Sequence, residues 1–139
     1  MSRLPTSWQV LVVEADRVFS ASLALKYGLH GHYARFAQSG SEAIAVMSFF
    51  EPTLAILGTE LPDLTGPELA RVIEARFPSC RFVFLSDHPS SHFSSEAAAG
   101  VHRPDVLIKS VHPETVYEDV SEMFPIDAAY NAPRSLPLT

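Results

Sequence analysis

Short apolar runs alternate along the chain with longer stretches in which apolar residues recur every three or four positions. The runs predict strands at residues 8–13, 32–37, 54–57, 82–85 and 106–108. Most of these runs are almost continuously apolar, as in strands that a parallel sheet buries on both faces. The run at residues 32–37 alternates only weakly, which predicts an edge strand.

The stretches between the runs predict about five helices. Phe19, Leu23 and Tyr27 recur at spacing four and predict the buried face of the first helix. Gly28 and Gly31 are expected to end this helix, because glycine is favoured just beyond a helix C-terminus.

Two capping boxes predict where the second and third helices begin. In residues 39–42 and 65–68, a hydroxyl residue is followed three positions later by glutamate. The expected buried faces of these helices comprise Ala43, Ile44, Met47 and Phe50, and then Leu69, Val72, Ile73 and Phe77. Residues 90–100 carry little apolar stripe and predict a short or mobile helix. The last helix is expected to open at Pro113 and to bury Val116, Val120 and Phe124.

Strands that alternate with helices indicate an α/β fold with a doubly wound parallel sheet. Right-handed crossovers favour a five-stranded sheet in the order 2-1-3-4-5, in a flavodoxin-like three-layer α/β/α arrangement. We expect an N-terminal extension at residues 1–7, the folded domain at residues 8–124 and a tail at residues 125–139. The domain is expected to stand alone, since no output domain is predicted after it.

The composition limits the classes of partner. The 139 residues carry a net charge of −6 and no basic cluster, so tight binding to nucleic acid or to an anionic membrane is not expected. The N-terminus lacks the apolar core of a signal peptide, and no run is long enough to span a bilayer. Cys80 is the single cysteine, which excludes an internal disulfide and indicates a buried structural thiol. We therefore predict a cytoplasmic protein.

A ligand site in an open parallel sheet lies beyond the carboxyl ends of the strands. The residues at those ends are Glu14, Ala15 and Asp16, then Gly58, Thr59 and Glu60, then Ser86, Asp87 and His88, and finally Lys109. The predicted crevice thus holds several carboxylates, a hydroxyl and one of the two lysines of the chain. Asp16 is in addition the predicted N-cap of the first helix.

Several short motifs occur in a fixed order at these places. They are the Val12-Val13-Glu14 opening, the segment 31–43, the loop from Leu61 and Pro62 to Gly66, the Leu85-Ser86 strand end and Lys109. In this order and spacing, residues 8–124 closely resemble bacterial response-regulator receiver domains of the CheY-like kind. The resemblance implies a domain that holds a divalent cation on acidic residues and accepts a phosphoryl group on an aspartate after the third strand.

The resemblance also implies a degenerate site. Glu14 matches the first acidic position, whereas Ala15 replaces the second and Gly58 replaces the acceptor aspartate. Ser86 and Lys109 match the hydroxyl and the lysine that bind the phosphoryl oxygens. Aspartyl phosphate cannot form on glycine, and Mg²⁺ affinity is expected to be weak or absent.

Other positions depart from the family pattern as well. Asp87 replaces a residue that is usually small, Ser110 replaces the proline after the lysine, and Val106 stands where the family often has an aromatic residue. We hypothesise that Asp87 or Glu14 pairs with Lys109 and fixes one conformation, because a half-buried ammonium needs a partner.

The function expected from the resemblance is that of a pseudo-receiver, not an enzyme, which acts by protein–protein contact in a two-component phosphorelay. Its expected partners are signalling proteins such as a histidine kinase or an output protein. By analogy, residues 88–124 are the partner surface or a homodimer surface, with Tyr117 as its probe. Two alternatives stay open: phosphorylation of a displaced carboxylate, Glu60 or Asp63, and binding or catalysis on a small anion by Ser86 and Lys109.

Two further groups of residues are not assigned chemistry. The Ser86-Asp87-His88 run does not indicate a catalytic triad, because consecutive residues that leave a strand tend to point to opposite sides. The histidines at positions 30 and 32, and at 88 and 92, are expected to lie in loops or on the surface. No catalytic residue and no metal ligand is therefore predicted.

Overall fold

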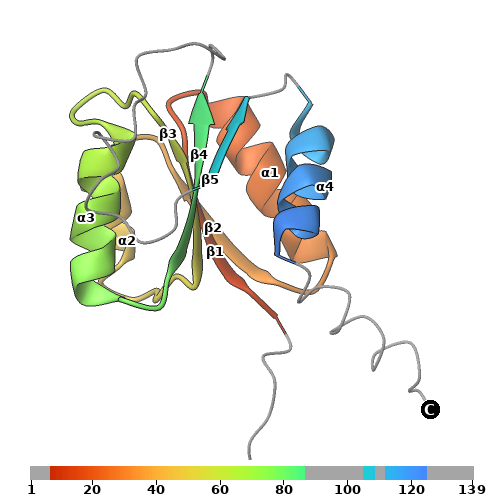
Figure 1. The fold of residues 1–139 in the computed structure, drawn as a ribbon, viewed down its shortest axis with the longest axis horizontal. Coiled ribbons are helices and arrows are strands. Elements are labelled where there is room, and N and C mark those ends of the chain that lie inside the picture. Colours follow the sequence, from red (N-terminus) through yellow and green to blue (C-terminus); the bar gives the residue numbers. More distant parts are fainter. Residues whose placement is uncertain (1–6, 87–104, 109–111, 125–139) are drawn as a thin grey trace, which may run out of the picture.

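The computed structural model describes residues 7–86, 105–108 and 112–124. Its strands form one sheet in the order β2-β1-β3-β4-β5, and neighbouring strands are parallel. The strands are β1 (Gln9–Val13), β2 (Tyr33–Ala37), β3 (Leu54–Gly58), β4 (Arg81–Ser86) and β5 (Asp105–Ile108). The described helices are α1 (Arg17–Leu29), α2 (Gly40–Val46), α3 (Gly66–Arg76) and α4 (Pro113–Met123). The predicted α/β fold with a parallel sheet is confirmed (Figure 1).

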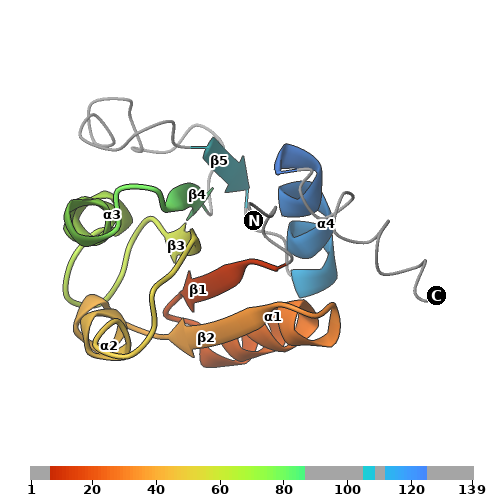
Figure 2. The ribbon, with the colours of Figure 1, turned by 90° about the horizontal axis from the view of Figure 1, so that it is seen from below.

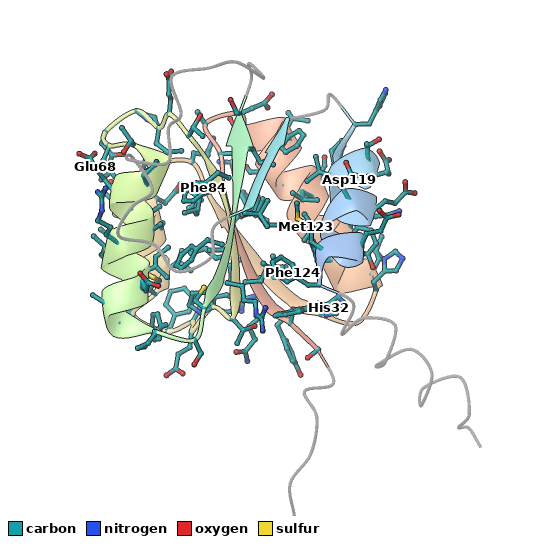
Figure 3. The ribbon with its side chains drawn as sticks, viewed as in Figure 1. His32, Glu68, Phe84, Asp119, Met123 and Phe124 are labelled. Carbon is teal, nitrogen blue, oxygen red and sulfur yellow. The ribbon has the colours of Figure 1, made fainter. Side chains whose placement is uncertain are left out.

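Helices cover both faces of the sheet: α2 and α3 lie on one face, and α1 and α4 lie on the other (Figure 2). Alternate residues of each strand therefore enter different cores. On β1, Leu11 and Val13 pack toward α2 and α3, whereas Val10 and Val12 pack toward α1 and α4. In Figure 3 the same division is seen across the sheet, with Phe84 on the α3 side and Phe124 beside α4.

Side-chain caps fix where the helices begin. Asp16 accepts a hydrogen bond from the backbone N–H of Phe19 at 3.1 Å, which confirms the predicted N-cap of α1. Thr65 and Glu68 form the complete capping box that was predicted for α3. The box predicted for α2 is only half made.

At the start of α2, Ser39 accepts from the N–H of Glu42. The Glu42 carboxylate, however, accepts a 2.6 Å bond from the backbone N–H of Gln38, one residue before the N-cap. The Glu42 side chain thus accepts from the N–H of Gln38 instead of from the N–H of the N-cap residue Ser39, which a complete capping box would use.

Some predicted helix details are wrong. Gly28 lies inside α1, which ends at Leu29 with His30 as its C-cap, and Gly31 beyond the cap has a positive φ of 90°. Ile44 is 37% exposed and Val72 is 39% exposed, so neither belongs to the core. The spacing of apolar residues predicted that Ile44 and Val72 are buried, but each lies at the edge of the buried face of its helix. The core positions are taken by Ala43 on α2 and by Leu69, Ala70 and Ile73 on α3.

Tyr117 is partly buried beside the core stripe of α4, and its use as a probe of a homodimer stays a prediction. Its ring packs against Tyr27 of α1 at 4.8 Å between centroids and against His30 at 4.5 Å. The Lys26 ammonium lies 5.7 Å from the centre of the same ring. Tyr117 therefore helps to join α4 to α1.

Several predictions lie outside the described residues. These concern the helix at residues 90–100, the tail at residues 125–139 and most of the extension at residues 1–7. Within the described part of the chain, no helix combines the length and the apolar character that crossing a membrane requires.

Candidate functional site

The carboxyl ends of the strands lie at one edge of the sheet, as parallel pairing requires (Figure 1). The register pairs Val13 with Leu57, and Gly58 with Leu85. Gly58 and Ser86 are the last residues of β3 and β4, and Glu14 directly follows the neighbouring strand β1. Of the residues predicted for the crevice, Asp87, His88 and Lys109 lie outside the described part of the structure, so the hypothesised pairing of Lys109 stays a prediction.

Glu14 is buried at the end of β1, with 8% of its surface exposed. Its backbone N–H donates to the carbonyl of Ala37 at 3.0 Å, which extends the pairing of β1 with β2 by one residue. Its side-chain Oε2 accepts a 3.1 Å hydrogen bond from the backbone N–H of Asp16, just before α1. These two bonds fix both the backbone and the carboxylate of Glu14.

The other carboxylate oxygen of Glu14 lies over Gly58. A Cβ atom built on Gly58 would stand 2.9 Å from Glu14 Oε1 and 3.5 Å from its Cδ. The distance of 2.9 Å is shorter than the distances at which Cβ atoms in proteins contact other heavy atoms. The space into which residue 58 would direct a side chain is therefore occupied by a carboxylate from the neighbouring strand.

The remaining predicted residues fall into different environments. Ala15 and Asp16 are exposed, and Asp16 uses its side chain as the α1 cap. Ser86 is buried, with 3% of its surface exposed, at the last position of β4. The structure therefore brings Glu14, Gly58 and Ser86 to one edge of the sheet. The side chain of Asp16 instead caps α1.

The loop after β3 folds back tightly on the strand end. The N–H of Gly66 donates to the carbonyl of Thr59 at 2.9 Å, and Glu60 forms an isolated antiparallel bridge with Thr65. A Cβ atom on Gly66 would collide with the backbone carbonyl of Gly58. A glycine at position 66 is thus required by the close approach of two backbone segments.

Asp63 is a residue whose role sequence reasoning missed. Although its side chain is on the surface, Oδ1 accepts from the N–H of Gly40 and Oδ2 from the N–H of Ser41, each at 2.8 Å. These two bonds lower the pKa of the Asp63 carboxyl. Leu64 completes the contact, since its Cδ2 lies 2.6 Å from where a Cβ on Gly40 would stand. Asp63 thus fastens the β3–α3 loop to the start of α2.

The histidines at positions 30 and 32 do not share a site. His32 is buried, and its Nδ1 accepts a 2.8 Å hydrogen bond from the backbone N–H of Trp8. The His30 ring packs on Tyr117 instead. Within the described ranges, no three His, Cys, Asp or Glu side chains gather so that they could hold a metal ion.

Cys80 is a buried thiol, as the sequence predicted. Burial, with a smaller effect from the charge of Glu74, raises the pKa of Cys80 to about 12. Because the thiolate is the reactive form, this cysteine is an inert part of the core.

Comparison with known proteins identifies a family and several relatives of this chain. Residues 10–121 match the family described as "Response regulator receiver domain". The chain is 35% identical over 81 residues to the transcriptional activator protein ExaE of Pseudomonas putida, covering 57% of this chain and 38% of ExaE. It is 29% identical over 100 residues to the photosynthetic apparatus regulatory protein RegA of Cereibacter sphaeroides, covering 72% of this chain and 54% of RegA. The chain thus spans about half or less of the length of these curated relatives.

Solved structures share the fold at low sequence identity. The CheY-like response regulator receiver domain protein from Methanospirillum hungatei superposes with a TM-score of 0.73. The identity is 20%, and the superposition covers 88% of this chain and 98% of that protein. This likeness concerns the fold alone.

Proposed function

This chain belongs to the response regulator receiver domain family, and we propose that it is a pseudo-receiver that signals without forming an aspartyl phosphate. The observation that carries the proposal is Gly58 at the carboxyl end of β3, beneath the Glu14 carboxylate. Glycine has no side chain that could attack a phosphoryl group. The position that matches the acceptor in the family motif is thus chemically inert.

The residues at the strand ends also fit a Mg²⁺ ion poorly. Mg²⁺ requires oxygen ligands in near-ideal octahedral geometry, and in proteins it is usually held by one or two carboxylates. Of the three positions that supply acidic side chains in the resemblance, only Glu14 carries one, since the other two are Ala15 and Gly58. The Glu14 carboxylate is in addition engaged by the N–H of Asp16. The described strand ends therefore offer a poor site for Mg²⁺.

The alternative of a displaced acceptor is weakened by the position of Asp63. Both of its carboxylate oxygens accept backbone hydrogen bonds from α2. Attack on a phosphoryl donor would break these bonds, and phosphoryl transfer depends mainly on positioning. Glu60 is exposed and lies in the bridged part of the loop. The alternative that uses Ser86 and Lys109 stays a prediction, since Lys109 lies outside the described residues.

The proposed mode of action is contact with signalling proteins, such as a histidine kinase or an output protein, in the cytoplasm. Family membership supports a signalling role over an enzymatic one. Homodimerisation through residues 88–124 stays a proposal. Within that range, α4 presents the exposed acidic side chains Glu114, Glu118, Asp119 and Glu122, which would favour a basic partner surface over a second copy of α4.

The test of the proposed function is the intact mass of the folded protein after incubation with a small phosphodonor and Mg²⁺. We expect no change in mass. A covalently bound phosphoryl group on any carboxylate would overturn the proposal.

A further inference from the structure

The backbone at Gly58 does not itself require glycine. Gly58 is the last residue of β3 and pairs with Leu85 of β4. Among the described glycines, a positive φ is found at Gly31 and not at Gly58. An L-residue can therefore adopt the backbone conformation of residue 58, and what a side chain there would meet depends on its surroundings.

Those surroundings differ between Gly58 and Gly66. At Gly66 a Cβ would meet the backbone of Gly58, which cannot easily move. At Gly58 the nearest atom to a Cβ is Glu14 Oε1, at 2.9 Å, and the next residue, Leu61, lies at an ordinary 3.7 Å. A side chain at position 58 would thus require the end of one flexible side chain, the Glu14 carboxylate, to move from its present place.

We propose that Glu14 takes the place of the missing side chain at position 58. Its carboxylate reaches from the end of β1 over Gly58, is buried there, and is held by the N–H of Asp16. The end of the sheet thereby keeps a permanent carboxylate that comes from β1 instead of β3. The two residues form a coupled pair, because a side chain at 58 and the present position of Glu14 exclude each other.

The pair has a consequence for regulation, and that consequence rests on the proposed function. Since Gly58 cannot be phosphorylated, the Glu14 carboxylate stays the acidic group at this strand end in the proposed pseudo-receiver. Glu14 is here a positioning residue, and its position at the N-terminus of α1 is favoured by the helix dipole.

A double-mutant cycle tests the coupling. The unfolding equilibrium constant is measured for the wild type, for Gly58→Ala, for Glu14→Ala and for the double variant. Gly58→Ala should be less favourable for stability in the protein that keeps Glu14 than in the protein that carries Glu14→Ala. For independent substitutions, the unfolding equilibrium constant of the double variant equals the value expected from the two single variants to within about twofold. We expect the measured constant to differ from that value by more than twofold. Agreement within about twofold would overturn the proposal.

Two further variants keep the test decisive if Glu14→Ala fails to fold. Glu14→Gln preserves the size of the side chain, so Gly58→Ala should change the stability of that background by about the same factor as in the wild type. The matched control is Gly28→Ala, because a Cβ on Gly28 meets nothing within 4 Å. The control should leave the protein as stable as the wild type or more stable.

A spectroscopic measurement reports on the carboxylate itself. The amide proton of Asp16 donates to Glu14 Oε2, so its NMR chemical shift should change in Gly58→Ala and stay unchanged in Gly28→Ala. An unchanged Asp16 shift in Gly58→Ala would overturn the proposal. These measurements are independent of phosphorylation: a phosphorylated wild type would refute the pseudo-receiver proposal and leave the measured coupling standing.

Discussion

Asp63 Oδ1 accepts a 2.8 Å hydrogen bond from the backbone N–H of Gly40, a residue 23 positions earlier in the chain. The second oxygen of the same carboxylate accepts from Ser41 at the same distance. One side chain thus joins the loop after β3 to the first turn of α2. The loop leads into Gly66, the first residue of α3, which lies close to the carbonyl of Gly58 at the candidate site.

Replacing Asp63 by alanine should lower the thermal midpoint of unfolding. The variant leaves the N–H groups of Gly40 and Ser41 without their side-chain acceptor, although water can partly replace it at this exposed place. Glu60→Ala serves as the control, because it removes an exposed carboxylate from the same loop. Equal midpoints for the two variants would mean that the Asp63 bonds contribute nothing to stability.

The contribution of Asp63 should also depend on pH. The backbone bonds from Gly40 and Ser41 lower the pKa of Asp63 in the folded protein. A carboxyl group with a lowered folded-state pKa stabilises the protein above its unfolded-state value, which is about 3.9 for aspartate. That stabilisation is lost as the pH falls through the lowered folded-state pKa.

The measurement is the difference in stability between the wild type and Asp63→Ala from neutral to acid pH. We expect a constant difference above about pH 5 and a smaller one below about pH 4. A difference that grew toward acid pH would contradict the assigned direction of the shift.

Two glycines should respond in opposite ways to alanine. Gly66→Ala forces a Cβ against the carbonyl of Gly58, so it should destabilise the protein by about 1–3 kcal/mol. Gly28→Ala places a methyl group in open space on α1 and should stabilise it by about 0.4–1 kcal/mol. Chemical denaturation of both variants checks the pair, and a tolerated Gly66→Ala would show that the β3–α3 loop is looser than described.

His32 should be essential for holding the start of β1. Its Nδ1 accepts the N–H of Trp8 within the core, and the Trp8 ring packs on Phe124 at 5.8 Å between centroids. His32→Leu should cost about 1–3 kcal/mol, because a buried backbone donor loses its acceptor. Trp8 is the sole tryptophan, so its fluorescence reports the change directly.

A surface substitution provides the comparison for His32→Leu. Val18 is 75% exposed, and Val18→Ala should leave both stability and fluorescence close to those of the wild type. If His32→Leu behaved like Val18→Ala, the Trp8–His32 bond would not be important for the fold.

Much of the fold follows from local patterns in the sequence. The apolar runs predicted the strands to within about one or two residues, and the caps at Asp16 and Thr65 were visible because capping residues act within one helical turn. The exposed positions of Ile44 and Val72 could not be predicted in this way. Spacing indicates that a helix has a buried stripe, whereas the width of the stripe depends on how the helix is rotated against the sheet.

In the candidate site, too, local sequence patterns predicted some features, whereas contacts between distant residues could not be predicted. Gly58 was found because it follows an apolar run at a position that a family motif specifies. Its contact with Glu14 joins residues 44 positions apart, and no local pattern indicates which carboxylate reaches over it. The bond between Asp63 and Gly40 escaped prediction for the same reason, because it joins a loop to a helix that only the folded sheet brings together.

The most direct test of the pseudo-receiver account is the intact mass of the wild-type protein after exposure to a small phosphodonor and Mg²⁺. Circular dichroism confirms that the sample is folded, and a receiver domain with an acceptor aspartate serves as the positive control in the same reaction. The account predicts that the control gains one phosphoryl group and that the mass of this protein is unchanged. A phosphoryl group on this protein through an acid-stable, base-labile bond would show that another carboxylate is the acceptor and would contradict the account.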